Sequence, residues 1–598
     1  MSSSALHHLS WDAYCEHVHL SKVLTEGANA CYAAKSSKPE AFLAQYFKSS
    51  VAADVIESLE AVEVPDGHGG YTLAFSLKLA SGKVVERTMG TSPVLALHPG
   101  TARKLTFSTL SRAATPLLTA PSPVNPKDPQ ANKPKPIIPA QRYEASARIV
   151  NATVAASLLG KSVVDQSTCD EVIATADGTS TLSTILAPTA AALSISVAQA
   201  AASILQTPLY RYLGSLNGVT RPVVPGVPPH LASAAMFLPR PIVTIFSTEP
   251  RHMGKVRVRE VCLIPLHNGL TTSTATATVQ ANLTGEQQQQ GSPTTTDPYT
   301  PLVSSPTCTQ CGAFAAFSPR LVQQLQAVYD YLIQKLDDPP TNPDGSIKFN
   351  SYETLIHVVE LVEEAVRESQ SGATIGVDFQ IGLVVDAALC FRTETAKYSF
   401  VEGTEYSGAQ LAEALAQLCR DKKIAYIEDT HHENDHAEMR RLMHRVGSTT
   451  VIASQHVFGG DLTAIATHAP QMLVNHMMMR LSDHGTLTHA VRCASTFRAA
   501  YPGATIGIIG DSNESSATSS SATIDVAVAL GARFVRIGGL LRSEHAALLS
   551  RLFEVQRSLE RENLLIPPPL WESCHLELPP APLEPVAEVN AKDAKKKK

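Results

Sequence analysis

Polar side chains that could hold a metal ion or an anion follow six short apolar runs in the second half of the chain. They are Asp386, Glu428, Ser454, Arg480, the stretch Asp511–Asn513 and Arg536, most of them separated by 25 to 30 residues. One β-strand and one α-helix together need an interval of this kind. Because barrel folds carry their chemistry at the carboxyl ends of the strands, these side chains form the candidate site of a predicted α/β barrel.

The composition indicates a globular protein of several domains. The chain has 598 residues, of which 44% are hydrophobic and 17% charged, so we expect two to four domains. A net charge of −6 argues against nucleic acid as the main partner. Ten cysteines are scattered along the chain, and the pair Cys308–Cys311 is half of a zinc site at most, so idle thiols in a reducing compartment are the favoured interpretation. No secretion signal is evident at the amino terminus, and we expect a cytoplasmic protein.

One uncharged stretch, residues 178–210, is long enough to cross a bilayer. It is rich in Ser, Thr, Ala and Gln and contains Pro188 and Pro208. A buried, alanine-rich helix fits this composition better than a membrane span, so we expect no membrane partner.

The first 50 residues predict a pair of helices with apolar stripes, the second one beginning near Pro39. A segment of this length cannot form a stable core alone, so self-association is expected. Residues 14–47, with Phe42–Phe47 at their end, resemble the dimerisation and docking module of protein kinase A regulatory subunits. That resemblance implies a homodimeric four-helix bundle that binds an amphipathic helix of a partner protein. A helical hairpin packed on its own chain is the alternative.

The chain also resembles the enolases over residues 54–560. The resemblance lies in five phrases in the family's order: Thr207–Arg211, Arg259–Pro265 as the first barrel strand, Ile424–Asp429, Met477–Arg480 and Arg542–Glu544. It implies an enolase-type (β/α)8 barrel preceded by an α+β cap domain. The alternating residues of 71–79 predict a β-hairpin in that cap, with a turn at Ser81-Gly82.

These resemblances give four predicted units. They are a helical docking module at 1–50, the cap domain at 51–220 with a Pro-rich insertion at 115–141, the barrel at 221–566 with a low-complexity loop at 270–306, and a disordered basic-ended tail at 567–598.

The resemblance implies a degenerate magnesium site. Asp386 and Glu428 match the first two metal carboxylates of the family, whereas the third position is Ser454, a neutral hydroxyl. Ser92 is a weak match to a serine of the family's capping loop. Since a hard cation is held mainly by anionic oxygens, we expect magnesium to bind weakly or not at all.

The predicted acid and base positions are also altered. Arg480 stands where the family has a lysine base, and a guanidinium neither loses its proton in proteins nor accepts one. Glu260 matches one glutamate of the acid machinery, but the other position falls near Cys311.

The substrate-binding positions are mixed. His252 matches the family's active-site histidine, with a surface histidine as the alternative, and Arg536 replaces a lysine while keeping its charge. The phosphate-binding triplet falls on Asn513, Glu514 and Ser515, where the glutamate would repel a phosphate.

A group of three histidines, His431, His432 and His436, includes two that are four residues apart, a spacing that can serve zinc. No third ligand is evident in the sequence, so solvated surface histidines are the favoured interpretation.

Three functions remain open. The favoured one is an enolase-like pseudoenzyme acting as a scaffold, similar to the flagellar and testis enolase-like proteins and therefore expected in a ciliary or flagellar axoneme. The second is an active phosphopyruvate hydratase that interconverts 2-phosphoglycerate and phosphoenolpyruvate in glycolysis. The third is a sensor that holds a small anionic metabolite with Arg480 and Arg536.

Overall fold

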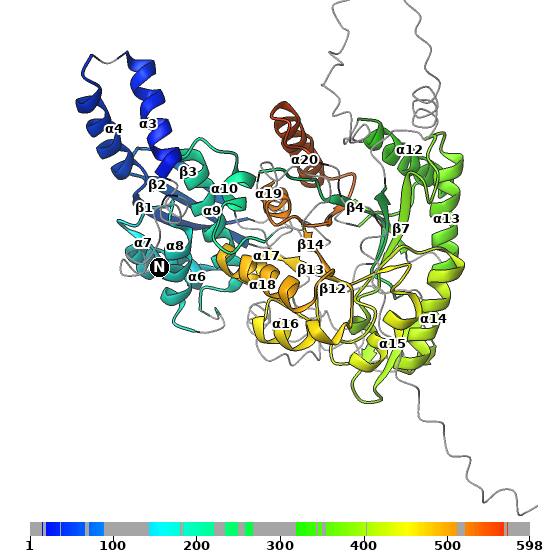
Figure 1. Cartoon of the computed structure of the whole chain (residues 1–598). Helices are drawn as coiled ribbons and strands as arrows, with labels where there is room; N and C mark the ends of the chain where they lie inside the picture. The colour runs from blue at the N-terminus through cyan, green and yellow to red at the C-terminus, as the bar shows by residue number, and fades with distance from the viewer. Residues whose placement is uncertain are drawn as a thin grey trace, which may run out of the picture.

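The computed structural model shows a helical hairpin, a mixed α+β domain and a barrel (Figure 1). The residues that it describes are 15, 20–35, 37–65, 71–88, 143–179, 182, 184–220, 234–248, 257–266, 319–342, 345–349, 354–401, 403–510, 521–566, 568 and 571. The predicted insertions at 115–141 and 270–306 lie outside these ranges.

Eight strands of the described chain close into a barrel, because β15 pairs with both β14 and β4. In the order of their pairing they are β4 (Arg240–Ser247), β5 (Glu260–Pro265), β7 (Phe379–Val384), β11 (Tyr426–Glu428), β12 (Val451–Ser454), β13 (His476–Arg480), β14 (Thr505–Ile509) and β15 (Phe534–Gly539). A short strand, β6 (Ile347–Lys348), adds to the end of β4. The predicted eight-stranded α/β barrel is therefore confirmed.

Helices follow the strands along the chain and surround the barrel (Figure 1). They are α12 (Pro319–Lys335), α13 (Leu355–Glu368), α14 (Gly408–Asp421), α15 (His436–Val446), α16 (Leu462–His468), α17 (Leu481–His484), α18 (Leu487–Ala500), α19 (Ala522–Ala529) and α20 (Ser543–Arg561). Between β7 and α14 the chain forms a small antiparallel sheet of β8 (Phe391–Arg392), β9 (Lys397–Val401) and β10 (Thr404–Tyr406).

The second strand of the barrel, β5, runs antiparallel to both of its neighbours, β4 and β7. The prediction that residues 259–265 form the first strand is therefore wrong, because β4 precedes them. The reversal has a chemical consequence. Glu260 begins β5, yet it pairs with Ser247 at the end of β4 and with Val384 at the end of β7. Its carboxylate thus reaches the same rim as the carboxyl ends of the other strands, which we call the barrel mouth.

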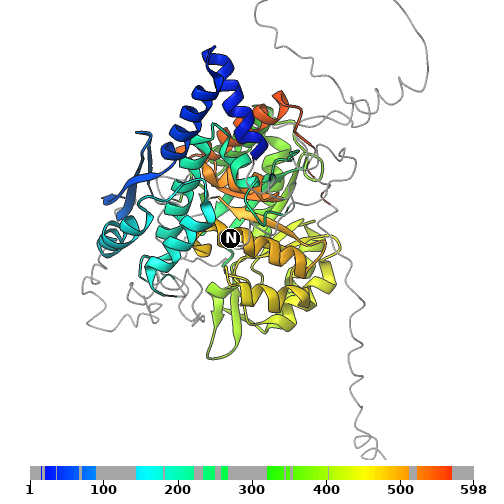
Figure 2. The same ribbon diagram turned by 60° about the vertical axis from the view of Figure 1, so that its left-hand side comes forward.

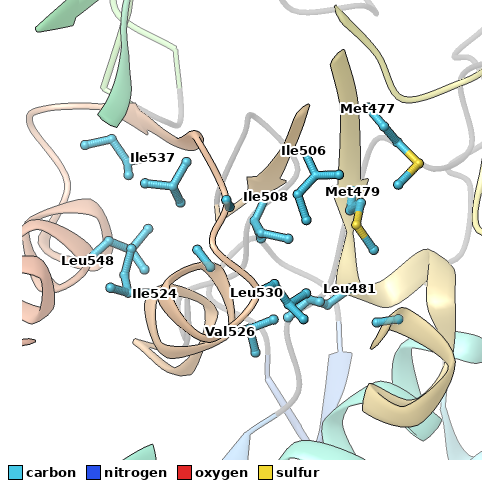
Figure 3. Close-up of a cluster of buried hydrophobic side chains, with 14 of the residues drawn as sticks. Met477, Met479, Leu481, Ile506, Ile508, Ile524, Val526, Leu530, Ile537 and Leu548 are labelled. Atoms are coloured by element: carbon cyan, nitrogen blue, oxygen red, sulfur yellow. The ribbon is translucent and has the colours of Figure 1, made fainter. Parts of the chain in front are cut away.

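Alternation along the strands separates two apolar regions, as expected for a pleated strand buried on both faces. Ile506 and Ile508 of β14 point outward into a cluster that also includes Met479 of β13, Ile524 of α19 and Leu548 of α20 (Figure 3). The inward set forms a second cluster, composed of Ile242, Cys262, Ile264, Val384, Ala425, Tyr426, Val451, Ala453, Met478, Ile509, Phe534 and Trp571.

The far end of the barrel is closed by an aromatic stack. Trp571 is buried, and its ring lies edge-on to Phe534 with centroids 5.2 Å apart, while the Arg240 guanidinium lies 6.0 Å from the indole. Residue 571 falls within the predicted tail at 567–598, so the packed part of the chain extends at least to this tryptophan.

The cap domain joins a three-stranded antiparallel sheet to a set of helices. The strands are β1 (Ile56–Pro65), β2 (Tyr71–Leu79) and β3 (Val84–Thr88), and the turn between β2 and β3 has Gly82 in a left-handed conformation, which confirms the predicted hairpin. The helices are α6 (Glu144–Ile149), a π-helical turn (Val150–Val154), α7 (Ala155–Leu158), α8 (Gln166–Asp177), α9 (Ala187–Ile204) and α10 (Leu209–Gly214).

Helix α9 is the one helix of the described chain that is long and apolar enough to cross a membrane, and 83% of its residues are buried in the protein. The sequence-based prediction of a buried helix within 178–210 is confirmed.

Two buried carboxylates attach the cap to the barrel. Asp170 of α8 accepts hydrogen bonds from the backbone nitrogen (2.9 Å) and hydroxyl (2.6 Å) of Thr488, in the first turn of α18. Asp525 of α19 accepts one from the backbone nitrogen of Tyr210 at 3.0 Å. Each carboxylate satisfies amide groups at a helix start that would otherwise lack partners, so the junction is polar and directional.

The amino-terminal hairpin consists of α3 (Leu20–Ala34) and α4 (Pro39–Ala53) and projects from the cap domain (Figures 1 and 2). Pro39 lies in the first turn of α4, as predicted. Gly27 of α3 allows the close contact, because a Cβ there would lie 2.5 Å from the Phe47 ring. Leu24 and Tyr32 of α3 remain 53% and 74% exposed, and Lys22 donates to the Thr207 hydroxyl at 3.0 Å.

Buried histidines predict an acid-labile fold. Burial lowers the pKa of His431 and His484 to about 4 and that of His476 to about 3, from an ordinary value of 6.5. The unfolded chain therefore binds more protons below pH 6.5, and the free energy of unfolding should fall as the pH falls through the range 6.5 to 4. Each histidine contributes a slope of about 1.4 kcal/mol per pH unit.

Urea denaturation at a series of pH values measures this slope. We expect His476→Gln to reduce it by about 1.4 kcal/mol per pH unit. Equal slopes for the His476→Gln variant and the unsubstituted protein would contradict the assignment of a neutral, buried imidazole.

Candidate functional site

Six of the predicted site residues lie in the described chain, and all six are at or just inside the barrel mouth. They are Glu260, Asp386, Glu428, Ser454, Arg480 and Arg536. The other five candidates, Ser92, His252, Cys311, Asn513 and Ser515, fall outside the described residues, and their roles stay predictions.

A fully buried ion pair joins Glu428 to Arg536 across the barrel. The guanidinium Nη1 donates to Glu428 Oε1 at 3.0 Å, and the Tyr426 hydroxyl donates to Oε2 at 2.7 Å. The exposed fraction of the two charged side chains is 0% and 1%. Arg536 is the third residue of β15, which continues to Gly539, so its side chain lies inside the barrel rather than at the rim.

Burial and charge set the protonation of this pair. Burial raises the pKa of the Glu428 carboxyl to about 6, and Arg536 acts in the opposite direction. Burial alone would lower the pKa of the Arg536 guanidinium, but Glu428 and Glu260 outweigh it and hold that pKa above its usual range. At neutral pH both partners are therefore charged.

A second buried ion pair lies at the mouth beside β5 and β7. Arg259 Nη1 donates to Asp386 Oδ2 at 2.9 Å, and its Nε lies 3.5 Å from Glu260 Oε1. The other Glu260 oxygen accepts from the Thr244 hydroxyl at 2.7 Å. One guanidinium thus lies between two buried carboxylates.

The position of Asp386 differs from that of a strand-end ligand. It lies two residues past the end of β7, with φ at 50°, a left-handed conformation that L-residues seldom adopt. The β7 residue that pairs with both Glu260 and Glu428 is the apolar Val384. On these three neighbouring strands, the row of paired residues that contains Glu260 and Glu428 therefore has no third carboxylate.

Sequence reasoning missed His456, which lies between two carboxylates at the rim. Its Nε2 is 3.3 Å from Asp386 Oδ1 and 3.6 Å from Asp429 Oδ2, and its side chain is 14% exposed. Ser454, the predicted third metal position, donates its hydroxyl to Asp429 Oδ1 at 2.6 Å. The signal in the sequence was a histidine two residues after Ser454, directly beyond an apolar run.

Arg480 ends β13 and is half-buried. Its Nη2 donates to Gln455 Oε1 at 3.1 Å, and the amide nitrogen of Gln455 donates to Asp483 Oδ2 at 2.9 Å. His484 Nδ1 lies 2.8 Å from the carbonyl oxygen of Arg480, which fixes the backbone behind it. The guanidinium offers only donors to this network, so it can orient an acceptor but cannot take up a proton.

The residues at the mouth do not fit a magnesium ion. Both oxygens of Glu428 accept hydrogen bonds, Asp386 is paired with Arg259, and the Ser454 hydroxyl is a donor to Asp429. Across the described residues, no group of three or more His, Cys, Asp or Glu side chains is arranged to hold a metal ion. A divalent ion would also meet the charges of two buried guanidinium groups, and this repulsion is strong where water is excluded.

The expectation that His431 and His432 are solvated is wrong: both are buried, with exposed fractions of 2% and 8%. His431 contacts the Thr430 hydroxyl and the Gly408 carbonyl oxygen, at 3.0 and 3.2 Å. The His432 ring packs on Phe391, with centroids 4.5 Å apart. The small β8–β10 sheet covers this loop, which a local sequence pattern does not reveal.

Two family models match the chain in succession. The model of the enolase N-terminal domain matches residues 132–213, and the model of the enolase C-terminal TIM barrel domain matches residues 350–565. The first range lies in the helical part of the cap, and the second includes six of the eight barrel strands, from β7 to β15.

Removal of Arg536 tests the energetics of the buried pair. We expect Arg536→Met to lower the free energy of unfolding by about 3–5 kcal/mol, since Glu428 would remain buried without its cation. Arg536→Lys keeps the charge and should cost less. The double variant Arg536→Met/Glu428→Gln should recover part of the loss, because it removes the stranded carboxylate. Urea denaturation of the three variants measures these differences, and a loss below 1 kcal/mol for Arg536→Met would contradict the pairing.

Proposed function

We propose that this enolase-like chain is a pseudoenzyme that serves as a scaffold rather than as a phosphopyruvate hydratase. The observation that carries the proposal is Arg480 at the end of β13, with its guanidinium bonded to Gln455. The matching position in the family holds the lysine that abstracts the substrate proton. A guanidinium keeps its proton in proteins, so the base is absent from that position.

The surroundings of Arg480 support the same conclusion. A general base typically contributes roughly a hundred- to ten-thousand-fold to a rate. A metal that stabilises the enolate contributes separately, and the carboxylates expected to bind it are paired with Arg259 and Arg536. Independent losses of this size multiply, so we expect no turnover rather than slow turnover. We accordingly propose that magnesium binds weakly or not at all.

A metabolite sensor that uses Arg480 and Arg536 together is less well supported. The charge of Arg536 is matched by Glu428 at 3.0 Å, and Glu260 acts on it as a second anion. An anion that approached Arg536 would meet both carboxylates, so the two arginines do not form a joint anion site.

The proposed scaffold role uses the amino-terminal hairpin. Leu24 and Tyr32 are largely exposed on α3, and apolar side chains on that face would be covered in a four-helix bundle with a second copy. We therefore propose a homodimer that binds axonemal or other protein partners through residues 14–47. The assignment to the cytoplasm, and within it to a cilium or flagellum, rests on the resemblance to enolase-like proteins of those organelles.

An assay of phosphoenolpyruvate absorbance, with magnesium and 2-phosphoglycerate, tests the pseudoenzyme proposal. We expect no product above a blank without protein, and an active enolase run in parallel shows that the assay detects turnover. Arg480→Lys alone should remain inactive, since the third metal position is still Ser454. Clear turnover by the unsubstituted protein that is lost in Arg480→Ala would overturn the proposal.

Sedimentation of the full chain tests the dimer. We expect Leu24→Asp to weaken self-association roughly thirtyfold, corresponding to about 2 kcal/mol, by placing a charge in the bundle. Ile356→Asp is the matched control, because Ile356 is similarly exposed, at 50% against 53%, but lies on α13 of the barrel. A monomeric unsubstituted chain, or an equal effect of both substitutions, would refute a dimer formed through the hairpin.

A further inference from the structure

The buried charged groups at the barrel mouth include two guanidinium groups among several carboxylates. Four buried carboxylates, those of Glu260, Asp386, Glu428 and Asp429, lie with two buried guanidinium groups, those of Arg259 and Arg536. Arg536 keeps the charge of the lysine that the resemblance places there, so the cation that can stand in for a metal ion is Arg259. Buried carboxylates stay ionised only where a positive charge or hydrogen-bond donors compensate for the lost water, so the mouth needs counter-ions at neutral pH.

We infer that the guanidinium of Arg259 takes the place of a divalent cation as a permanent counter-ion of the barrel mouth, and that removing its charge turns the mouth into a divalent-cation site. The inference deepens the proposed function and rests on it. A barrel mouth whose counter-ions are side chains of the protein needs no metal ion for folding and holds no metal ion for catalysis.

Arg259 is the better position for testing the exchange. Its side chain is 3% exposed and lies between Asp386 Oδ2, at 2.9 Å from Nη1, and Glu260 Oε1, at 3.5 Å from Nε. A cation in the place of this guanidinium would therefore have a carboxylate oxygen on each of two sides. His456 Nε2 is 3.3 Å from the second Asp386 oxygen and could add a nitrogen donor.

This donor set suits manganese as a probe. Carboxylate oxygens favour magnesium, calcium and manganese, and Mn²⁺ also accepts an imidazole ligand. In the unsubstituted protein the same oxygens face a fixed positive charge, and a divalent ion would have to displace it from a buried site. Arg259→Gln removes that charge while keeping a side chain that can donate hydrogen bonds, whereas Arg259→Lys keeps the charge.

The experiment measures Mn²⁺ binding by the loss of the free-ion electron paramagnetic resonance signal, together with the thermal unfolding midpoint, for the full-length protein and its variants. We expect the unsubstituted protein and Arg259→Lys to bind little Mn²⁺ and to show no shift of the midpoint. Arg259→Gln should bind at least about tenfold more tightly and show a saturable rise of the midpoint. Arg551→Gln is the matched control, because it removes a guanidinium from a buried carboxylate, Asp525, away from the mouth, and it should gain no Mn²⁺ affinity.

Each result decides the inference. An Arg259→Gln chain that folds only when Mn²⁺ is added supports it as strongly as a gain in affinity. If Arg259→Gln fails to fold with or without Mn²⁺, the smaller substitution Arg259→Ser takes its place in the same test. The inference is overturned when neither variant gains affinity or a metal-dependent fold, while the absence of turnover still stands. Tight binding of Mn²⁺ by the unsubstituted protein, accompanied by turnover, would overturn both the inference and the proposed function.

Discussion

The ion pair between Glu428 and Arg536 is the constraint on which the rest of the barrel mouth depends. Two opposite charges are removed from water at the centre of the barrel, and each is tolerated only because of the other. The Tyr426 hydroxyl donates a hydrogen bond to the second carboxylate oxygen. The Tyr426 ring lies edge-on to Phe534, which is two residues before Arg536 on β15. Aromatic packing beneath the pair thus fixes the strands that carry it.

From this pair the polar contacts extend outward along the rim. Glu260 acts on Arg536 and lies beside Arg259, which holds Asp386, and Asp386 in turn contacts His456. Ser454 and Asp429 close the same chain of contacts from β12 and β11. In such a network the removal of one member leaves a neighbour without a partner, so the mouth behaves as a unit. The side chains at the positions that resemble a metal site form ion pairs and hydrogen bonds with neighbouring side chains.

The sequence predicted the repeating part of the fold and failed where distant segments determine the structure. The intervals between polar residues after 380 indicated strands and helices, because period and length are local properties. The antiparallel course of β5 has no local signature. The phrase Arg259–Pro265 was matched to the first strand, although β4 precedes it. Glu260, Glu428 and Arg480 could be found by matching phrases. The pairing partners Arg259 and Tyr426 could not, because their roles arise from strand register, and His456 was missed although it follows the apolar run that ends at Ser454.

The connection between the amino-terminal hairpin and the cap leaves little freedom for swivelling. Helix α4 ends at Ala53 and β1 begins at Ile56, and the intervening backbone is bonded to the turn after α7, where Val163 donates to the Asp54 carbonyl oxygen and Ile56 to that of Lys161. Lys22 makes a further contact with Thr207. A protein that binds the hairpin would therefore also fix the orientation of the whole barrel relative to itself.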